Sequence, residues 1–367
     1  MESLTIRRNK SFFILLIYFI FLFLNVFIEN MSSYGYIQSL IFGVVFFFCS
    51  KWKECINNII LTLVLLVPVW INSNSSYLYL INDCFTLFLV LSCIDAFRSL
   101  ELSGQQRRII ARLFLLYSIM FIVCAAFPSF YDGEDSRYAG LLHGANTSSS
   151  VLMFILAFII EYYKDSKIKL FVYCTSFICF IICVFLSNTR SIFIGIPYLL
   201  WLYRENINLK KVWPIIFLII ALGAYLIVPN LIFISEDLRL TAEDTSMLTR
   251  ASLYESIWEG IASNYYIIAH GPNACVAFIQ NLTESDRYSP HNDMLSYWYD
   301  WGIVWLIVLS IMFIRIKRYL EVYKMNIGAI FLFLFVMSCG LHNIMMHIYI
   351  WIPLICIMWI RRIQTKL

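Results

Sequence analysis

Apolar segments recur along the whole of this 367-residue chain, and each is about long enough to cross the hydrocarbon of a lipid bilayer. Hydrophobic residues make up 61% of the chain and charged residues only 14%, whereas soluble domains carry about 25% charged residues. In lipid every backbone polar group has to be paired within the chain, so we expect these segments to be helices. The predicted spans are 11–28, 35–50, 57–72, 77–97, 109–127, 147–163, 170–187, 191–203, 212–232, 295–314, 325–341 and 347–360.

Lysine and arginine predict how these spans are oriented. With the N-terminus in the cytoplasm, each loop on that side carries basic residues, from Arg7 and Arg8 before the first span to Arg361 and Arg362 after the last. This agrees with the positive-inside rule. The basic N-terminus resembles a signal sequence, but no small-x-small cleavage site follows it, so we expect a retained first span. The prediction is an all-α, polytopic transmembrane helical bundle of about twelve spans, a single integral membrane domain over 1–367, with both termini cytoplasmic.

Two connections on the opposite face are long, at 128–146 and 233–294. Loops of this size in a compact protein are usually functional, so we expect them to form the active face. No internal repeat is evident, which disfavours a transporter built from inverted repeats. Of the eleven cysteines only Cys275 lies in a long polar loop, and no Cys/His spacing fits zinc. We therefore expect no disulfides and no metal site.

Arginine and histidine gather on that same face, where lysine does not occur. The guanidinium fork matches phosphate oxygens in pairs, and histidine takes and returns a proton near neutrality. These side chains could therefore bind a phosphate-bearing ligand and move a proton. Lysine is disfavoured in translocated loops in any case, and the many acids of 233–294 argue against a general anion-attracting surface. The residues are Arg137, Arg190, Arg239, Arg250, Arg287, His143, His270, His291, His342 and His347.

Three of these arginines stand in distinctive settings. Arg190 lies in a short turn between two apolar segments, where a charge is either functional or a snorkelling interface residue. Arg250 begins a helical pattern and is either directed toward the bundle or solvated. Its apolar stripe, which predicts a helix lying along the membrane surface, is Tyr254, Ile257, Trp258 and Ile261. Arg137 opens a segment whose glycines would let backbone approach a ligand closely.

His291 is the strongest candidate among the histidines. With Asn292 it lies where the second long loop returns to the membrane, so it could face a cavity or instead cap the following helix. His342 and His347 frame a short hairpin and rank second. His270 is expected in a turn, and His143 is open between function and structure.

Several of these motifs together resemble a known superfamily. They are Arg137-Tyr138-Ala139-Gly140 with Asn146, Thr189-Arg190, Arg250 before an amphipathic helix, Gly271, and His291-Asn292 followed by Gly302. In this order they resemble the O-antigen polymerase and ligase superfamily, the Wzy-type polymerases and WaaL-type ligases of bacterial surface polysaccharide assembly. Two departures stand out: the Arg250 to Gly260 spacing is one residue short of an Arg-x10-Gly pattern, and Asp300-Trp301-Gly302 replaces Glu-x-Gly.

The resemblance implies a multi-pass protein of the bacterial inner membrane with a periplasmic active face. Its donor would be a glycan carried on undecaprenyl diphosphate, with no cofactor, no metal and no nucleic-acid partner. By analogy Arg190 and Arg250 would bind the leaving diphosphate, and His291 would position or deprotonate the attacking hydroxyl. Arg137, Tyr254, Asn292 and His342 are the expected substrate contacts.

The two long loops favour a polymerase, because that enzyme holds two lipid-linked glycans, and a chain-length regulator protein would then be a partner. A ligase that transfers the glycan to lipid A core uses the same donor. A flippase for lipid-linked oligosaccharide is a third reading, but it needs polar groups inside the spans, where Asp83 is the clearest.

Overall fold

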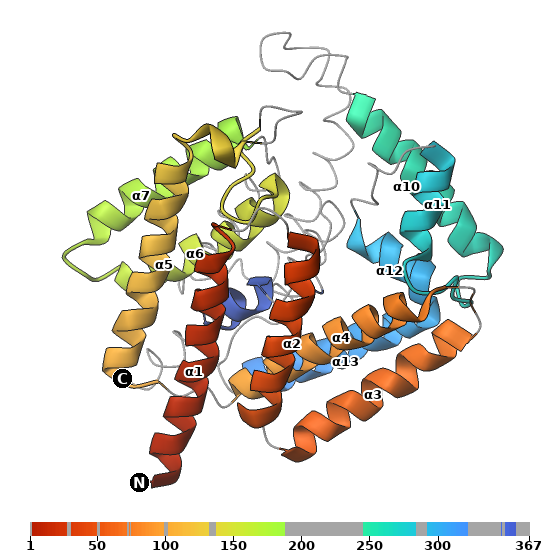
Figure 1. The fold of residues 1–367 in the computed structure, drawn as a ribbon, viewed down its shortest axis with the longest axis horizontal. Coiled ribbons are helices and arrows are strands. Elements are labelled where there is room, and N and C mark those ends of the chain that lie inside the picture. Colours follow the sequence, from red (N-terminus) through yellow and green to blue (C-terminus); the bar gives the residue numbers. More distant parts are fainter. Residues whose placement is uncertain are drawn as a thin grey trace.

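The computed structural model describes residues 2–27, 31–49, 52–71, 73, 75–98, 102–131, 137–187, 245–283, 292–321, 346 and 349–356. Within these ranges all named elements are helices, and the only β-type pairing is an isolated bridge between Tyr131 and Tyr138. The helices, shown in Figure 1, are α1 (Glu2–Leu24), α2 (Met31–Cys49), α3 (Trp52–Ile71), α4 (Tyr77–Arg98), α5 (Gly104–Cys124), the 3-10 turn η1 (Pro128–Phe130), α6 (Ala145–Tyr163), α7 (Lys169–Ile181), the π-helical turn η2 (Ile182–Leu186), α10 (Thr245–Ser263), α11 (Ala274–Thr283), α12 (Asp293–Trp301) and α13 (Ile303–Glu321).

Four of the described helices are long and apolar enough to cross a membrane, judged by length and composition: Trp52–Ile71, Tyr77–Ala96, Ala145–Tyr163 and Lys169–Leu186. They coincide with the predicted spans 57–72, 77–97, 147–163 and 170–187. The expectation of a helical protein with apolar, membrane-length helices is therefore confirmed at this level. The predicted spans 191–203, 212–232 and 325–341 lie outside the described residues.

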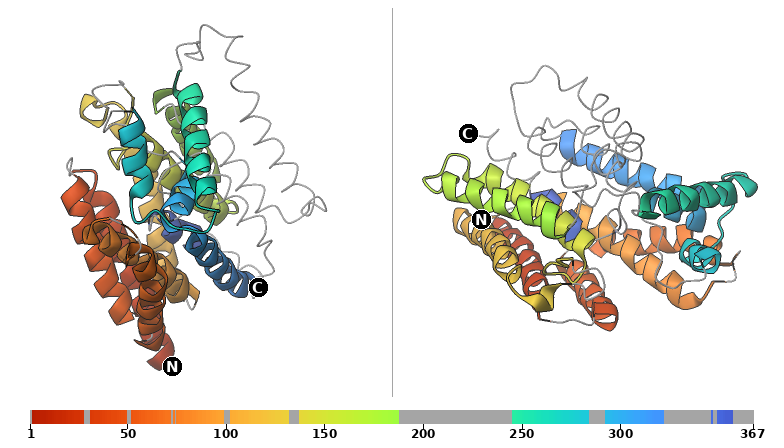
Figure 2. Two further views of the ribbon diagram at one scale, coloured as in Figure 1. Left: turned by 90° about the vertical axis from the view of Figure 1, so that its right-hand side faces the viewer. Right: turned by 90° about the horizontal axis from the view of Figure 1, so that it is seen from above.

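Helix α6 lies at the centre of one part of the bundle. Its side chains from Ser148 to Ile159 are all buried, and α5 and α7 both pack against it. A helix that is buried on all sides has to be apolar on all sides, which the run Val151–Ile159 satisfies. Figure 1 shows α1, α2 and α5 side by side, with α3, α4 and α13 to their right at an oblique angle, and Figure 2 gives two further views of the bundle.

The predicted span 295–314 is not one helix but two, because α12 ends at Trp301 and α13 begins at Ile303. The break is at Gly302, whose backbone has φ 54° and ψ −135°, a conformation that side chains exclude. A Cβ at this position would overlap the carbonyl oxygen of Ile267 and lie 2.9 Å from the backbone nitrogen of Ala269. The chain after α10 thus crosses directly over the α12–α13 junction.

Helices α10, α11 and α12 form a small unit with a hydrophobic cluster of its own, which we call the α10–α12 subdomain. The cluster consists of Leu253, Ile257, Ile261, Cys275, Ile279 and Tyr299. The stripe predicted to lie along the membrane surface is therefore divided: Ile257 and Ile261 are buried in this cluster, whereas Trp258 is 44% exposed. The apolar face of α10 contacts α11 and α12, so its amphipathic pattern reflects packing within the subdomain.

Candidate active site

The first long outer loop is fastened to the end of α7. The guanidinium of Arg137 donates from Nε and Nη2 to the carbonyl of Ser187, at 3.3 and 3.2 Å, and the backbone nitrogen of Tyr138 donates to the carbonyl of Leu186 at 2.9 Å. A cation at a helix C-terminus interacts favourably with the helix dipole. This terminus is the π-helical turn η2, a distortion that is frequent at functional sites. Arg137 therefore anchors the backbone that leads into the predicted Arg190 turn.

Glycine in this loop allows close packing against α6. Gly140 has φ 74°, and a Cβ there would lie 2.5 Å from that of Ser148. The Ser148 hydroxyl donates to the carbonyl of Ala139 at 2.8 Å and accepts from the backbone nitrogen of Leu142 at 3.0 Å. The close approach predicted for this glycine thus occurs between the loop and its own following helix, and the two hydrogen bonds of Ser148 hold this part of the loop against α6.

A buried polar network that sequence reasoning missed joins both ends of the chain. Asn25 donates to the hydroxyl of Tyr349 at 3.2 Å, Gln38 donates to the side-chain oxygen of Asn25, and Tyr349 donates to the side-chain oxygen of Gln38. His143, with φ 51°, places Nε2 2.9 Å from the carbonyl of Asn25. The side chains of Asn25, Gln38 and Tyr349 form a closed ring of hydrogen bonds, and His143 contacts the backbone beside it. Its partner Asn25 is 118 residues away and gives no local signal.

Asn292 begins helix α12. Its side-chain oxygen accepts from the backbone nitrogen of Leu295 at 3.0 Å, which makes it the N-cap, and Asn292 and Asp293 are both buried. An asparagine directly before an aspartate and an apolar run is a sequence signal for this role. The cap fixes the backbone that follows His291, which itself lies outside the described residues.

Helices α10 and α12 run in the same direction across their contact. Trp258 lies against Trp298 with ring centroids 5.8 Å apart, and a Cβ on Gly260 would lie 2.6 Å from the ring of Tyr299. The contact therefore advances toward the C-terminus along both helices. It places the first half of α10, which contains Arg250 and Tyr254, at the same end of the subdomain as the N-terminus of α12 (Figure 1).

Asp300 serves as an anchor for helix α11. Its carboxylate accepts from the backbone nitrogen of Cys275 at 2.6 Å, in the first turn of that helix. A carboxylate at a helix N-terminus pairs otherwise unsatisfied backbone donors and interacts favourably with the helix dipole. The acid in the Asp300-Trp301-Gly302 step therefore organises the subdomain.

His270 lies in the turn between α10 and α11. Its ring stacks on Tyr299 at 3.8 Å, Nε2 lies 2.9 Å from the side-chain nitrogen of Asn264, and Nδ1 lies 3.1 Å from the carbonyl of Tyr299. Burial lowers the pKa of the imidazole below its ordinary value, and the hydrogen bond to the Tyr299 carbonyl opposes this shift. The stacking and both polar contacts give His270 a packing role.

The subdomain is tied to the α3–α4 hairpin at two points. The indole of Trp301 donates to the carboxylate of Asp83 at 2.8 Å. Gly271, with φ 112°, packs so closely that a Cβ would lie 2.6 Å from the hydroxyl of Ser75 and would overlap Ser73. These contacts fix the subdomain at the end of α3 and the beginning of α4.

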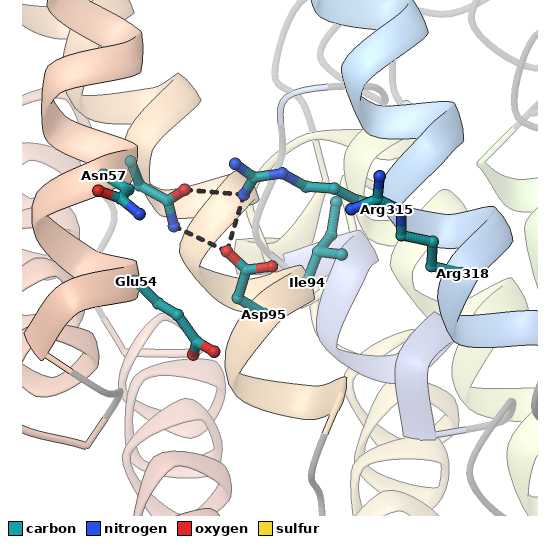
Figure 3. Close-up of a pocket in the computed structure, with 7 residues that line it drawn as sticks. Glu54, Asn57, Ile94, Asp95, Arg315 and Arg318 are labelled. Carbon is teal, nitrogen blue, oxygen red and sulfur yellow. Dashed lines mark hydrogen bonds and ion pairs between the residues drawn. The ribbon is translucent and has the colours of Figure 1, made fainter.

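A polar pocket of about 250 Å³ lies at the opposite end of the same helices (Figure 3). Its central group is Arg315, whose Nη1 donates to Asp95 and to Asn58, both at 2.7 Å, while Asn58 also donates to Asp95 at 3.0 Å. This network joins α3, α4 and α13. The pocket is lined by Glu54, Asn57, Asn58, Ile94, Asp95, Arg315 and Arg318. It lies near the start of α3 and the ends of α4 and α13, and none of its lining residues is a predicted site residue.

The predicted site residues are only partly described. Arg190, His291 and His342 lie outside the described residues, and Arg250 lies on α10. The described part of the site consists of two pieces: Arg137 against the end of α7, and α10 with Tyr254 beside the helix that Asn292 caps. Among the described residues, no group of three or more His, Cys, Asp or Glu side chains could hold a metal ion.

The described helices and this subdomain define a helical protein with membrane-length apolar segments. A family model described as O-Antigen ligase matches residues 175–310, and this match confirms the resemblance to the O-antigen polymerase and ligase superfamily. Comparison with curated proteins and with solved structures gave no match.

Proposed function

We propose that this chain is a glycosyltransferase that polymerises repeat units of surface polysaccharide carried on undecaprenyl diphosphate. The observation that carries the proposal is the extent of the family match. Residues 175–310 include Arg190, Arg250 and His291, the three residues that the sequence predicts to be catalytic.

In the proposed reaction a hydroxyl of the acceptor sugar attacks the anomeric carbon of the donor glycan. The bond from that carbon to the diphosphate oxygen breaks, and a new glycosidic bond forms. His291 takes the hydroxyl proton, and Arg190 and Arg250 stabilise the negative charge that develops on the leaving diphosphate. The proton then passes to solvent or to the released diphosphate. Since the donor is already activated, the reaction needs no nucleotide. We also propose that it needs no metal ion, because the two guanidinium groups neutralise the leaving diphosphate.

The described residues support the proposal in two places: the backbone that leads to Arg190, and the end of the α10–α12 subdomain where Arg250 and His291 belong. Arg137 fixes the carbonyl of Ser187, three residues before Arg190 in the sequence. The parallel packing of α10 and α12 places the half of α10 that contains Arg250 at the same end as the N-cap Asn292, directly after His291. Arg137, Tyr254, Asn292 and His342 remain proposed substrate contacts. Arg137 and Asn292 also hold backbone, at Ser187 and at the first turn of α12.

We propose an inner-membrane location with twelve spans, both termini cytoplasmic and the 128–146 and 233–294 loops in the periplasm. The arrangement along α3, α4 and α13 supports this orientation. The α10–α12 subdomain lies at one end of these helices. Arg315 and Arg318 lie at the other, close to the predicted cytoplasmic loop that contains Lys324.

The second candidate is an O-antigen ligase that transfers the glycan to lipid A core, and the description of the matching family favours it. Deletion of the gene in its host distinguishes the two. Loss of a polymerase leaves single repeat units on the core and removes the partner of any chain-length regulator. Loss of a ligase leaves bare core with accumulated lipid-linked glycan. Lipid-linked glycan trapped on the cytoplasmic leaflet would instead indicate a flippase and contradict both proposals.

A further inference from the structure

Helix α10 ends in a turn that carries tyrosine where glycine is usual. The backbone nitrogen of Tyr265 donates to the carbonyl of Ala262 at 2.9 Å, and that of Tyr266 donates to the carbonyl of Ile261 at 3.0 Å. This pair of bonds is the Schellman arrangement, whose left-handed position is most often glycine. Here Tyr265 has φ 56° and Tyr266 φ 61°. Two consecutive residues with large side chains are thus held in a conformation that is unfavourable for them.

Packing within the chain does not explain the choice of these side chains. Tyr265 is 77% exposed, and the next two apolar residues, Ile267 and Ile268, are 57% and 55% exposed. With Tyr266, whose ring centroid lies 5.4 Å from that of Trp258, these side chains form an exposed apolar surface, which we call the 264–268 surface. The segment 264–268 contains no charged residue. An exposed apolar patch with this composition indicates a binding surface.

The location of the surface points to lipid. The carbonyl of Ile267 accepts from the backbone nitrogen of Ile303, at the first residue of α13, at 3.0 Å. The segment after it packs through Gly271 on the hairpin between α3 and α4, where two helices of membrane length meet. Tyr77 and Tyr79, at the start of α4, are also exposed. Tyrosine and tryptophan are enriched at both membrane–water interfaces, where the ring is in the apolar region and the polar group reaches water.

We propose that the 264–268 surface is inserted in the lipid headgroup and acyl boundary of the bilayer that the chain spans, and that it anchors the α10–α12 subdomain there. A glycan is the other class of partner that binds aromatic surfaces. However, Trp258 and Trp298 meet edge to face, with an interplanar angle of 88°, and Trp258 and Tyr266 are tilted by 53°. The rings therefore do not form one flat platform for a sugar ring, and the neighbouring isoleucines suit acyl chains better.

This anchor replaces the one that the sequence predicts. The stripe of α10 was expected to contact the membrane, but Ile257 and Ile261 are buried against α11 and α12. The membrane contact passes instead to the turn after the helix. Because Gly302 and Ile303 hold that turn against the α12–α13 junction, the anchor also sets the height of α12 relative to the bilayer.

The test uses the full chain in lipid nanodiscs with a photoreactive residue at single positions. The variants are Tyr265→p-benzoylphenylalanine, Ile267→p-benzoylphenylalanine and, as control, the exposed Glu255→p-benzoylphenylalanine on α10. After irradiation, mass spectrometry should detect phospholipid adducts at the first two positions and none at the control. Adducts at all three positions in equal yield, or none at the two loop positions, would overturn the proposal. Crosslinks from these positions to the sugars of added lipid-linked oligosaccharide would indicate instead that the surface binds glycan.

A second measurement needs no substitution. Hydroxyl-radical footprinting of the wild-type protein in nanodiscs reports the access of water to tyrosine rings. The proposal predicts that Tyr265 is protected from oxidation although it is 77% exposed in the isolated chain. Oxidation of Tyr265 at the rate of a water-exposed tyrosine would contradict it. Both readouts are independent of transferase activity, so their failure would leave the proposed function untouched.

Discussion

Replacing Gly302 with alanine should weaken the attachment of the α10–α12 subdomain to helix α13. Gly302 has φ 54° and ψ −135°, and a Cβ would overlap the carbonyl oxygen of Ile267. That carbonyl accepts the hydrogen bond from Ile303 which joins the turn after α10 to the start of α13. Since the added atom meets backbone, the clash cannot be relieved by a side-chain rotation.

The expected magnitude follows from two terms. Holding a non-glycine residue in this conformation costs about 1–3 kcal/mol. Loss of the Ile303 hydrogen bond adds about 0.5–1.5 kcal/mol. Gly302→Ala should therefore lower the free energy of unfolding by roughly 2–4 kcal/mol, a large part of the stability of a typical domain.

The assay is thermal unfolding of the purified protein in detergent, combined with limited proteolysis of the subdomain. Gly302→Ala should unfold at lower temperature and be cleaved faster between α10 and α12. Gly104→Ala is the matched control, because a Cβ at the first residue of α5 meets nothing within 4 Å. That variant should be at least as stable as wild type. Equal stability and proteolysis of Gly302→Ala and wild type would refute the reasoning.

Three further predictions concern charged residues. Arg190→Ala and Arg250→Ala should each abolish polymer formation at normal protein levels. Lysine at either position should not restore it, because an ammonium group lacks the paired donors of a guanidinium. Wild-type chain lengths in a lysine variant would show that this arginine is not part of the site. Asp300→Ala should expose α11 to protease and destabilise the subdomain by about 1–3 kcal/mol, since the buried backbone nitrogen of Cys275 loses its acceptor. Asp300→Asn, which keeps an acceptor, should do less harm. Equal proteolysis of the two variants would argue against the capping role. Asp95→Ala should lower the unfolding temperature, because it removes the carboxylate that pairs with Arg315. The double variant Asp95→Leu with Arg315→Met should recover most of this loss. No recovery would show that the pair is more than a structural link.

The helices with uniform apolar character were predictable from sequence, because the requirement to span lipid acts on each segment separately. The predicted span 77–97 and α4 (Tyr77–Arg98) agree almost to the residue, as do 147–163 and α6 (Ala145–Tyr163). The break at Gly302 was not predicted. Hydropathy continues through Trp301 and Ile303, and only the chain crossing over the junction requires the interruption there.

The candidate site was predictable in its residue types and less so in its contacts. The pattern of Tyr254, Ile257, Trp258 and Ile261 predicts a helix, which α10 confirms, but periodicity says nothing about the partner. For Ile257 and Ile261 that partner is the hydrophobic cluster shared with α11 and α12. Asn292 carried a recognisable capping signal. The network of Asn25, Gln38 and Tyr349 could not be predicted, because two of its bonds join residues more than 300 positions apart.

Binding of undecaprenyl diphosphate to the purified protein in nanodiscs tests the central claim most directly. The measurement compares wild type, Arg190→Ala, Arg250→Ala and the double variant by titration. If both guanidinium groups hold one diphosphate, each single change should weaken binding strongly, and the double change should cost less than the sum of the two. Unchanged binding in either single variant, or strictly additive losses, would contradict a shared site.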